Sequence, residues 1–235
     1  LHVRGRRQRQ MCIRDRNKVV TIDGPVASGK GTVARILADK LKFIHLDSGV
    51  LYRLTALFSQ RQSPPLKEEN KIAKLATLLP VRFVGEKVFV GEENVSKAIR
   101  SEAVSQLASQ IAILPMVRAA LLEKQRQFLQ ESSLVADGRD MGTVVFPDAF
   151  LKIFLTAPAK ERAKRRALQL GFNEHSSEYN RIYQQLLQRD ARDQNRAISP
   201  LIPAKDAYLL DNSGLNIEQT VEKVLFYYQQ ANNRV

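Results

Sequence analysis

The stretch VVTIDGPVASGKGT, residues 19–32, decides the fold of this chain. A run of apolar residues comes first, a glycine-rich segment follows, and the chain then continues in a helical pattern. The apolar face of that helix is made of Val33, Ile36, Leu37 and Leu41, which recur at i, i+3, i+4 and i+8. The segment Gly24–Lys30 fits the pattern G-x-x-x-x-G-K, which requires a strand before it and a helix after it. We therefore predict a strand, a tight glycine loop and a helix that begins near Gly29.

A loop of this kind is suited to binding phosphate. Glycines let the backbone wrap around an oxyanion, and the first N–H groups of the helix point at that oxyanion together with the positive end of the helix dipole. Lys30 then reaches the β- and γ-phosphates. We assign the phosphates of ATP to the loop residues Gly24, Pro25, Val26, Ala27, Ser28, Gly29, Lys30, Gly31 and Thr32.

One position departs from the usual pattern of such loops. The residue after Lys30 is Gly31, where a Ser or Thr hydroxyl usually contacts Mg²⁺. The hydroxyl comes one residue later, at Thr32. We expect Mg²⁺ with the ATP and retain Thr32 as a candidate contact, while the direct metal ligand stays open.

The rest of the chain predicts a parallel sheet covered by helices. Five apolar runs of strand length alternate with helical patterns, which is typical of an α/β fold with helices on both faces of the sheet. The runs are VVTI (19–22), FIHL (43–46), LVA (134–136), KIFLTA (152–157) and YLL (208–210). Four of them end on an aspartate: Asp23, Asp47, Asp137 and Asp211. We expect a three-layer α/β/α fold of the P-loop NTPase type, with its site beyond the carboxyl ends of five parallel strands.

An insertion interrupts this pattern. The pair Pro64-Pro65 breaks the chain, and residues 81–95 read as a hairpin with a turn at Gly85-Glu86. Its alternating apolar residues are Val81 and Phe83 on one strand and Val88 and Val90 on the other. We predict an inserted subdomain at 63–102 and a core formed by 19–62 and 103–235. One helix is expected to lead from the insertion back to the strand at 134.

The composition indicates a globular protein with one large core. The chain has 235 residues, 44% of them hydrophobic, which is enough for one sizeable core without disulfides. The net charge is +13, of which residues 1–18 supply +6, so we interpret this basic segment as a disordered leader and leave open whether it is native. Cys12 is the single cysteine, which favours a reducing, cytoplasmic compartment. No apolar run reaches the ~18 residues of a membrane span, so no membrane partner is expected.

Arginines gather in two clusters near residues 158–196. Arg189, Arg192, Asp193 and Arg196 share one face of a helix, and Arg162, Arg165 and Arg166 lie on the helix before it. A solvated charged face is the plain explanation of such a run. Two guanidinium clusters on a helical hairpin also suit a lid that closes over phosphates, because their forked donors match phosphate oxygens.

Several sequence blocks together resemble bacterial cytidylate kinases, which belong to the nucleoside monophosphate kinase family of P-loop kinases. The blocks are IDGPVASGKGT (22–32), LDSGVLYR (46–53), ADGRDMGTVVFPDA (136–149), KIFLTA (152–157) and RDARDQNR (189–196). They occur in register, together with the hairpin insertion, along essentially all of residues 19–232. The resemblance implies a small nucleoside-monophosphate-binding subdomain, a helical lid, and the transfer of the γ-phosphoryl group of ATP to CMP and dCMP.

The resemblance also implies roles for individual residues. Lys30, Arg139, Arg189 and Arg192 are expected to be catalytic. The phosphate of CMP is expected at Ser48, Arg53 and Arg139, the cytosine at Ser109, Arg118 and Asp140, and the remaining nucleotide contacts at Arg189, Asp193 and Arg196. Asp137 either caps a turn or organises Arg139. The acceptors Asp140 and Ser109 beside the donor Arg118 match the hydrogen-bonding groups of cytosine, whereas uracil would leave a polar group unpaired.

Two other interpretations stay open at this stage. The acceptor could be AMP, UMP or a small alcohol, because the fold alone does not fix it. The basic charge could also indicate a nucleic-acid-associated P-loop protein, although phosphate chemistry already accounts for many of the arginines. We expect a monomer whose partners are small nucleotides and not nucleic acid.

Overall fold

The computed structural model describes residues 17–62, 68–84 and 87–234. The predictions for residues 1–16, for the Pro64-Pro65 break and for the Gly85-Glu86 turn lie outside the described residues. In chain order the elements are β1 (Val19–Asp23), α2 (Lys30–Leu41), β2 (Ile44–Asp47), α3 (Ser48–Gln62), α4 (Glu69–Leu78), β3 (Val81–Val84), β4 (Lys87–Val90), β5 (Glu93–Asn94), the short helix η1 (Ala98–Arg100), α5 (Glu102–Ile111), α6 (Pro115–Glu131), β6 (Leu134–Gly138), the π-helical turn η2 (Met141–Val145), β7 (Leu151–Thr156), α7 (Ala159–Gln169), α8 (Ser177–Gln194), β8 (Tyr208–Asp211) and α9 (Ile217–Asn233).

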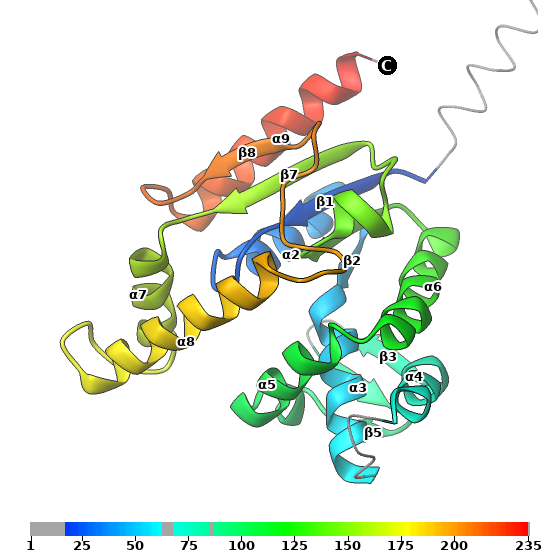
Figure 1. The fold of residues 1–235 in the computed structure, drawn as a ribbon. Coiled ribbons are helices and arrows are strands. Elements are labelled where there is room, and N and C mark those ends of the chain that lie inside the picture. Colours follow the sequence, from blue (N-terminus) through cyan, green and yellow to red (C-terminus); the bar gives the residue numbers. More distant parts are fainter. Residues whose placement is uncertain (1–16, 63–67, 85–86, 235) are drawn as a thin grey trace, which may run out of the picture.

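A parallel sheet of five strands forms the centre of the molecule, in the order β2-β6-β1-β7-β8 (Figure 1). This confirms the predicted sheet. All five residues of β1 are buried, and successive side chains contribute to two different clusters. Val20 and Ile22 pack with α2 and α9, whereas Val19 packs in the cluster that contains α3 and α6. The sheet is therefore the middle of three layers, as expected for an α/β/α fold.

The register of the sheet brings the predicted aspartates to one edge. Asp23 at the end of β1 lies opposite Gly138 of β6, and Asp47 at the end of β2 lies opposite Asp137. The phosphate loop follows β1 directly, and α2 begins at Lys30. The carboxyl edge of the sheet thus carries both the loop and the acidic residues.

The inserted hairpin is present, but the region around it differs from the prediction in two ways. Val81 pairs with Val90 and Phe83 with Val88, as the alternation indicated, and β5 adds a third strand that the sequence reading missed. The single helix expected before β6 is wrong, because α5 and α6 are separate helices that meet at 102°. Pro115 begins α6 and Leu114 before it is extended, which ends α5. The boundaries at 63 and 102 stay a prediction.

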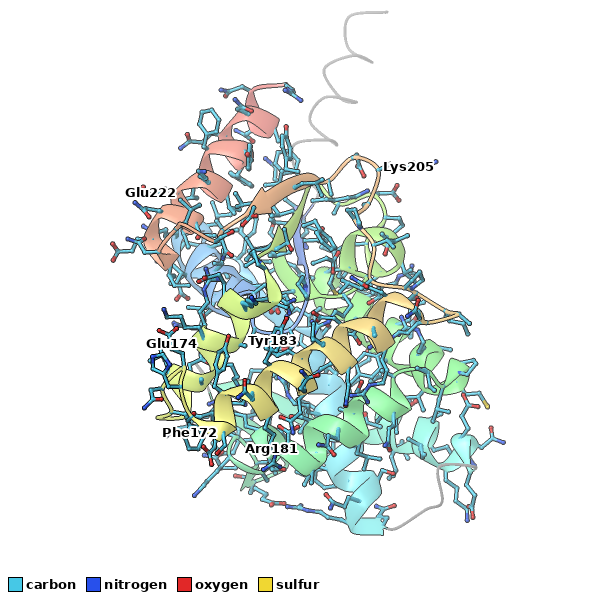
Figure 2. All side chains as sticks on the ribbon, turned by 60° about the vertical axis from the view of Figure 1, so that its left-hand side comes forward. Phe172, Glu174, Arg181, Tyr183, Lys205 and Glu222 are labelled. Carbon is cyan, nitrogen blue, oxygen red and sulfur yellow. The ribbon has the colours of Figure 1, made fainter. Side chains whose placement is uncertain are left out.

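Helices α7 and α8 pack side by side and form the segment expected as a lid (Figure 1). Their apolar contact includes Ala163 and Ala167 of α7 and Ile182 and Leu186 of α8. Val26 and Ala27 of the phosphate loop pack against the same cluster. Figure 2 shows Phe172 and Glu174 in the turn that joins the two helices. The pair of helices α7 and α8 therefore packs directly against the phosphate loop.

No single helix within 17–62, 68–84 and 87–234 has both the length and the apolar character of a membrane span. By length and composition alone, the bent pair formed by Glu102–Ile111 and Pro115–Gln130 meets them jointly.

Candidate active site

The phosphate loop has the backbone conformation that its glycines predicted. Gly24 has φ 157°, and a Cβ atom there would lie 2.1 Å from the carbonyl oxygen of Leu155 in β7. Gly29 has φ 87° and is the N-cap of α2, where no side chain caps the helix. Ala27 also has positive φ, 59°, although it is not a glycine. The first N–H groups of α2 are therefore left without side-chain partners, as an anion site requires.

Lys30 lies between positive and negative groups at the start of α2. Its Nζ donates to the carbonyl of Pro25 at 3.5 Å. Burial and, next, the charge of Arg139 lower the pKa of Lys30 to about 7, while Asp137 and Asp47 act in the opposite direction. An anion placed beside such a lysine strongly stabilises its charged ammonium form.

Asp137 has a partner that sequence reasoning did not assign. Nε2 of His45 lies 2.8 Å from Oδ1 of Asp137, and Gly31 faces Oδ2 of the same carboxylate. Burial lowers the pKa of His45, but the hydrogen bond to Asp137 and the charges of Asp137 and Asp47 together outweigh burial and raise the pKa above its usual value. Sequence reasoning gave His45 no role in the site. The missed signal was its spacing, because residues i and i+2 of a strand share a face and Asp47 follows at that distance.

The start of α3 forms a second polar group of the site. Arg53 donates from Nη2 to Oδ2 of Asp47 at 3.0 Å, and the N–H of Val50 donates to Oδ1 at 3.0 Å. Burial alone raises the pKa of Asp47, but Arg53 and other neighbouring charges hold it below its usual value. Ser48 is buried against Gly138, where a Cβ atom would lie 2.5 Å from Oγ of Ser48. Glycine at 138 thus lets β6 approach the serine.

Arg139, Asp193 and Arg196 form a buried ion-pair group, in which Arg139 comes 54 positions before Asp193. Nε of Arg139 donates to Oδ2 of Asp193 at 2.7 Å, and Nη2 of Arg196 donates to Oδ1. Asp193 is 1% exposed. Burial alone raises its pKa, but the two guanidinium groups hold it below the usual value. Contrary to the prediction, Arg196 does not extend the helix face, because α8 ends at Gln194.

Arg189 and Arg192 are on α8, and both line the cleft. Burial, followed by the charge of Arg139, lowers the pKa of Arg189 to about 10, and its buried Nε has no hydrogen-bond partner among the described residues. Arg192 is exposed and donates from Nε to the carbonyl of Gln188 at 3.4 Å. An unpaired buried guanidinium beside Arg139 is a place where an anion would be stabilised.

Arg118 and Asp140, for which the resemblance implies contacts with the cytosine, form an ion pair with each other. Nη2 of Arg118 donates to Oδ2 of Asp140, and Nη1 donates to the carbonyl of Ala112 at 3.1 Å. Ser109 on α5 is buried, and its Oγ has no hydrogen-bond partner in the part of the chain that is described. Burial raises the pKa of the nearby Tyr52 to about 12, while the charge of Arg118 acts in the opposite direction. Tyr52 was not predicted, although it belongs to the LDSGVLYR block.

The segment that carries Arg139 and Asp140 is held by Asp23. The Asp23 carboxylate accepts hydrogen bonds at 2.8 Å from the main-chain N–H groups of Met141 and Gly142, at the start of η2. Burial raises the pKa of Asp23 to about 7. Asp23 thus connects the end of β1 to the π-helical turn.

The arginines of α7 form only in part the cluster that the sequence indicated. Arg162 is buried and donates to the carbonyls of Ala157 and Val26 at 2.8 and 3.0 Å and to Oδ2 of Asp190 at 2.6 Å. Arg165 donates twice to Asn212. The reason is that a helix presents side chains in several directions, and only its packing decides which of them reach the cleft. Arg165 and Arg166 line the cleft, but Arg162 supports the loop from behind.

A cleft of about 1660 Å³ joins part of these groups. The phosphate loop, Asp47, Arg53, Ser109 and Arg189 all line it. It extends past the loop to Arg165 and Arg166 and to residues that the sequence reading did not assign, which are Gln169, Leu170, Asn212, Leu215, Asn216 and Ile217. The loop and Lys30 therefore share one space with Arg53, Ser109 and Arg189. Outside the loop, the predicted residues that are not among its lining residues are Ser48, Arg118, Asp137, Arg139, Asp140, Asp193 and Arg196.

Comparisons with known proteins agree with this geometry. Cytidylate kinase of Neisseria meningitidis serogroup B is 52% identical over 217 residues, which are 92% of this chain and 100% of that protein. Cytidylate kinase of Pasteurella multocida is 48% identical over 216 residues, 90% of this chain and 95% of that protein. The crystal structure of an uncharacterized protein from Eubacterium ventriosum shares the fold, with a TM-score of 0.51 and 11% identity over 92% of this chain and 99% of that one. The sequence model of the cytidylate kinase family matches residues 20–230, so the chain belongs to the cytidylate kinase family.

Proposed function

We propose that this chain transfers the γ-phosphoryl group of ATP to CMP, and also to dCMP, giving ADP and the cytidine diphosphate. The observation that carries the proposal is the presence of two cationic groups in one cleft. Lys30 and the loop form one group, Arg53 and Arg189 form the other, and all of them line the cleft. The cytidylate kinases that match the whole length of the fold support the same reaction. The proposal includes a monomer in the cytoplasm that acts on small nucleotides.

On the donor side, the loop binds the phosphates of ATP. The free N–H groups at the start of α2 and the ammonium of Lys30 hold the β- and γ-phosphates. Catalysis of phosphoryl transfer consists mainly of positioning and charge neutralisation, because the transition state carries its charge on the phosphoryl oxygens. Lys30, Arg139, Arg189 and Arg192 are the groups that we propose to stabilise this charge.

On the acceptor side, we propose that separate groups bind the phosphate, the ribose and the base of CMP. Ser48, Arg53 and Arg139 hold the phosphate, and Asp193, Arg189 and Arg196 hold the ribose and its surroundings. The base contacts are proposed for Arg118, Asp140 and the unpaired hydroxyl of Ser109. A uracil ring in this position would leave a buried polar group unpaired, at a cost of about 1–3 kcal/mol.

Mg²⁺ is expected with ATP, and the residues fit it. The described residues include no group of three or more His, Cys, Asp or Glu that would hold a metal by themselves. Mg²⁺ in kinases usually takes one or two carboxylates together with phosphates and water. Asp47 and Asp137 lie near Lys30 and supply such oxygens, and Thr32 exposes a hydroxyl in the first turn of α2. When bound, the ion would neutralise part of the phosphate charge.

The reaction needs no general base from the protein. The acceptor oxygen belongs to a phosphate monoester, whose second pKa is about 6, so it is anionic at neutral pH. The protein must instead exclude water, which would otherwise accept the phosphoryl group. We propose that α7 and α8 close over the cleft for this purpose, because α8 carries Arg189 and Arg192 at the edge of the cleft.

A panel of acceptors tests the proposed function. ADP release from ATP is measured with CMP, dCMP, UMP, AMP and a small alcohol at equal concentrations. CMP and dCMP should give much the highest kcat/KM. A preference for AMP, UMP or the alcohol would assign the chain another acceptor, and no release with any of them would refute the kinase assignment.

A further inference from the structure

Asn212 lies where the end of β8, the phosphate loop and α7 meet. About 1% of the residue is exposed. Its Nδ2 donates to the carbonyl of Ser28 at 3.0 Å, and its Oδ1 accepts from Nη1 of Arg165 at 3.0 Å. Its main-chain carbonyl accepts from Nη2 of Arg165 at 2.7 Å, and its N–H donates to the carbonyl of Thr156 at 3.0 Å. The side chain is therefore held at both of its polar ends.

The orientation of the Asn212 amide follows from its partners. A main-chain carbonyl can only accept a hydrogen bond, and a guanidinium can only donate. The nitrogen of the amide must therefore face Ser28, and the oxygen must face Arg165. No other residue type of the same size offers one donor and one acceptor in these directions.

The contact with Ser28 fixes a peptide unit of the phosphate loop. The C=O of Ser28 and the N–H of Gly29 belong to one planar trans unit, so they point in opposite directions. Because Asn212 holds the carbonyl, it also fixes the direction of the Gly29 N–H. Gly29 is the N-cap of α2 and has φ 87°. Asn212 thus sets the geometry where the anion-binding N–H groups begin.

A second contact holds the loop two peptide units further back. Nη1 of Arg162 donates to the carbonyl of Val26 at 3.0 Å. The two held carbonyls, those of Val26 and Ser28, flank Ala27, whose φ of 59° is unfavourable for a residue with a Cβ atom. Side chains from outside the loop thus maintain a conformation that the loop sequence alone would not favour.

We propose that Asn212 is a positioning residue for the donor nucleotide. It holds the Ser28 carbonyl so that the loop is shaped for phosphate before ATP binds, and through Arg165 it links that shape to α7. The proposal rests on the proposed function, because it takes the loop as the site of the ATP phosphates. If Asn212 had only a structural role, its substitution would lower the stability of the protein. The affinities for ATP and CMP would then change together, or both would stay unchanged.

The variant Asn212→Asp tests the proposal. It keeps the size of the side chain and the acceptor for Arg165, but it replaces the donor by an oxygen that faces the Ser28 carbonyl. Gln125→Glu is a matched control, because Gln125 is also 1% exposed and its Nε2 donates to the carbonyl of Leu121 in α6 at 2.8 Å. Both variants bury an acid in place of an amide. They differ in the carbonyl that the amide contacts, which belongs to the phosphate loop for Asn212 and to α6 for Gln125.

Dissociation constants for ATP and for CMP are measured separately by calorimetry, at a temperature where circular dichroism shows each variant to be folded. Asn212→Asp should raise the Kd of ATP at least tenfold and change the Kd of CMP by less than twofold. Gln125→Glu should change both values by less than twofold. If Asn212→Asp does not fold, Asn212→Ala is measured in the same way and should show the same selective loss.

Two results would overturn the proposal. One is an unchanged Kd for ATP in the folded variant, and the other is an equal loss of affinity for ATP and CMP. The wild-type chain is measured first with both nucleotides. A wild type that binds ATP and phosphorylates CMP, combined with either result, would refute the role of Asn212 alone, whereas a wild type without ATP binding would refute the proposed function.

Discussion

The protonation of Lys30 should change when ATP binds. In the free protein, burial and, next, the charge of Arg139 lower the pKa of Lys30 to about 7, and Arg189 adds to this effect. The phosphates of ATP stabilise the ammonium, so the pKa in the complex should return to the ordinary range of a lysine. Because the pKa is lower in the free protein than in the complex, binding must take up a proton at any pH between the two values.

The size of the effect follows from the lowered pKa. At pH 8 only about 9% of the free protein would carry the Lys30 ammonium, so binding should take up about 0.9 proton, compared with about 0.5 at pH 7 and about 0.1 at pH 6. The affinity for ATP should fall about fivefold between pH 7 and pH 8 and about 50-fold between pH 7 and pH 9. The triphosphate itself is fully ionised at pH 8 and does not contribute to the uptake.

Calorimetry measures this uptake directly. ATP is titrated at pH 8, without metal and without acceptor, in buffers of different ionisation enthalpy, and the slope of the observed enthalpy gives the number of protons. Lys30→Arg is the control, because a guanidinium with a pKa above about 12 is already charged and should show a slope near zero. Arg189→Met should reduce the uptake, since one of the charges that lowers the lysine pKa is removed. A wild-type slope near zero, or an equal slope in Lys30→Arg, would refute the reasoning.

Three further outcomes can be measured. Arg118→Met should raise the KM for CMP about 10- to 100-fold, because a charge-assisted hydrogen bond is lost, and leave the Kd of ATP within twofold; an equal loss for both nucleotides would contradict base reading. Lys30→Ala should lower kcat by about 10²–10³ with an unchanged melting curve, whereas near-normal turnover would remove Lys30 from catalysis. Arg162→Met leaves Asp190 buried without its partner and should lower the free energy of unfolding in urea by about 3–5 kcal/mol, and a loss below about 1 kcal/mol would show that the pair is not needed.

The phosphate loop is connected to helices α7 and α8, which we propose as a lid. Val26 and Ala27 of the phosphate loop pack against the same apolar cluster that joins α7 and α8. Arg162 extends this connection to Asp190 on α8. A movement of α8 toward the cleft would therefore act on the loop as well as on Arg189. The phosphate loop, α7 and α8 are thus joined by apolar packing and by the hydrogen bonds of Arg162.

Sequence reasoning was most successful where the signal is local. The five strands, the glycine loop and the start of α2 were predicted because apolar runs, glycines and helix spacing depend on residues only a few positions apart. The third strand β5 was missed because two residues, Glu93 and Asn94, carry no pattern. The break between α5 and α6 was missed although Pro115 signals it.

The sequence by itself determined that a phosphate loop joins a strand to a helix, and that acidic residues lie at the ends of the strands. The tertiary structure decided which side chains meet: Arg139 and Asp193 are 54 positions apart, His45 and Asp137 are 92 apart, and Ser28 and Asn212 are 184 apart. The tertiary structure also turned Arg162 away from the cleft and placed Tyr52 beside Arg118. The physical reason is that spacing along a helix or strand fixes only the face on which a residue lies. The partner of that residue depends on how the layers pack and on which buried polar groups must pair.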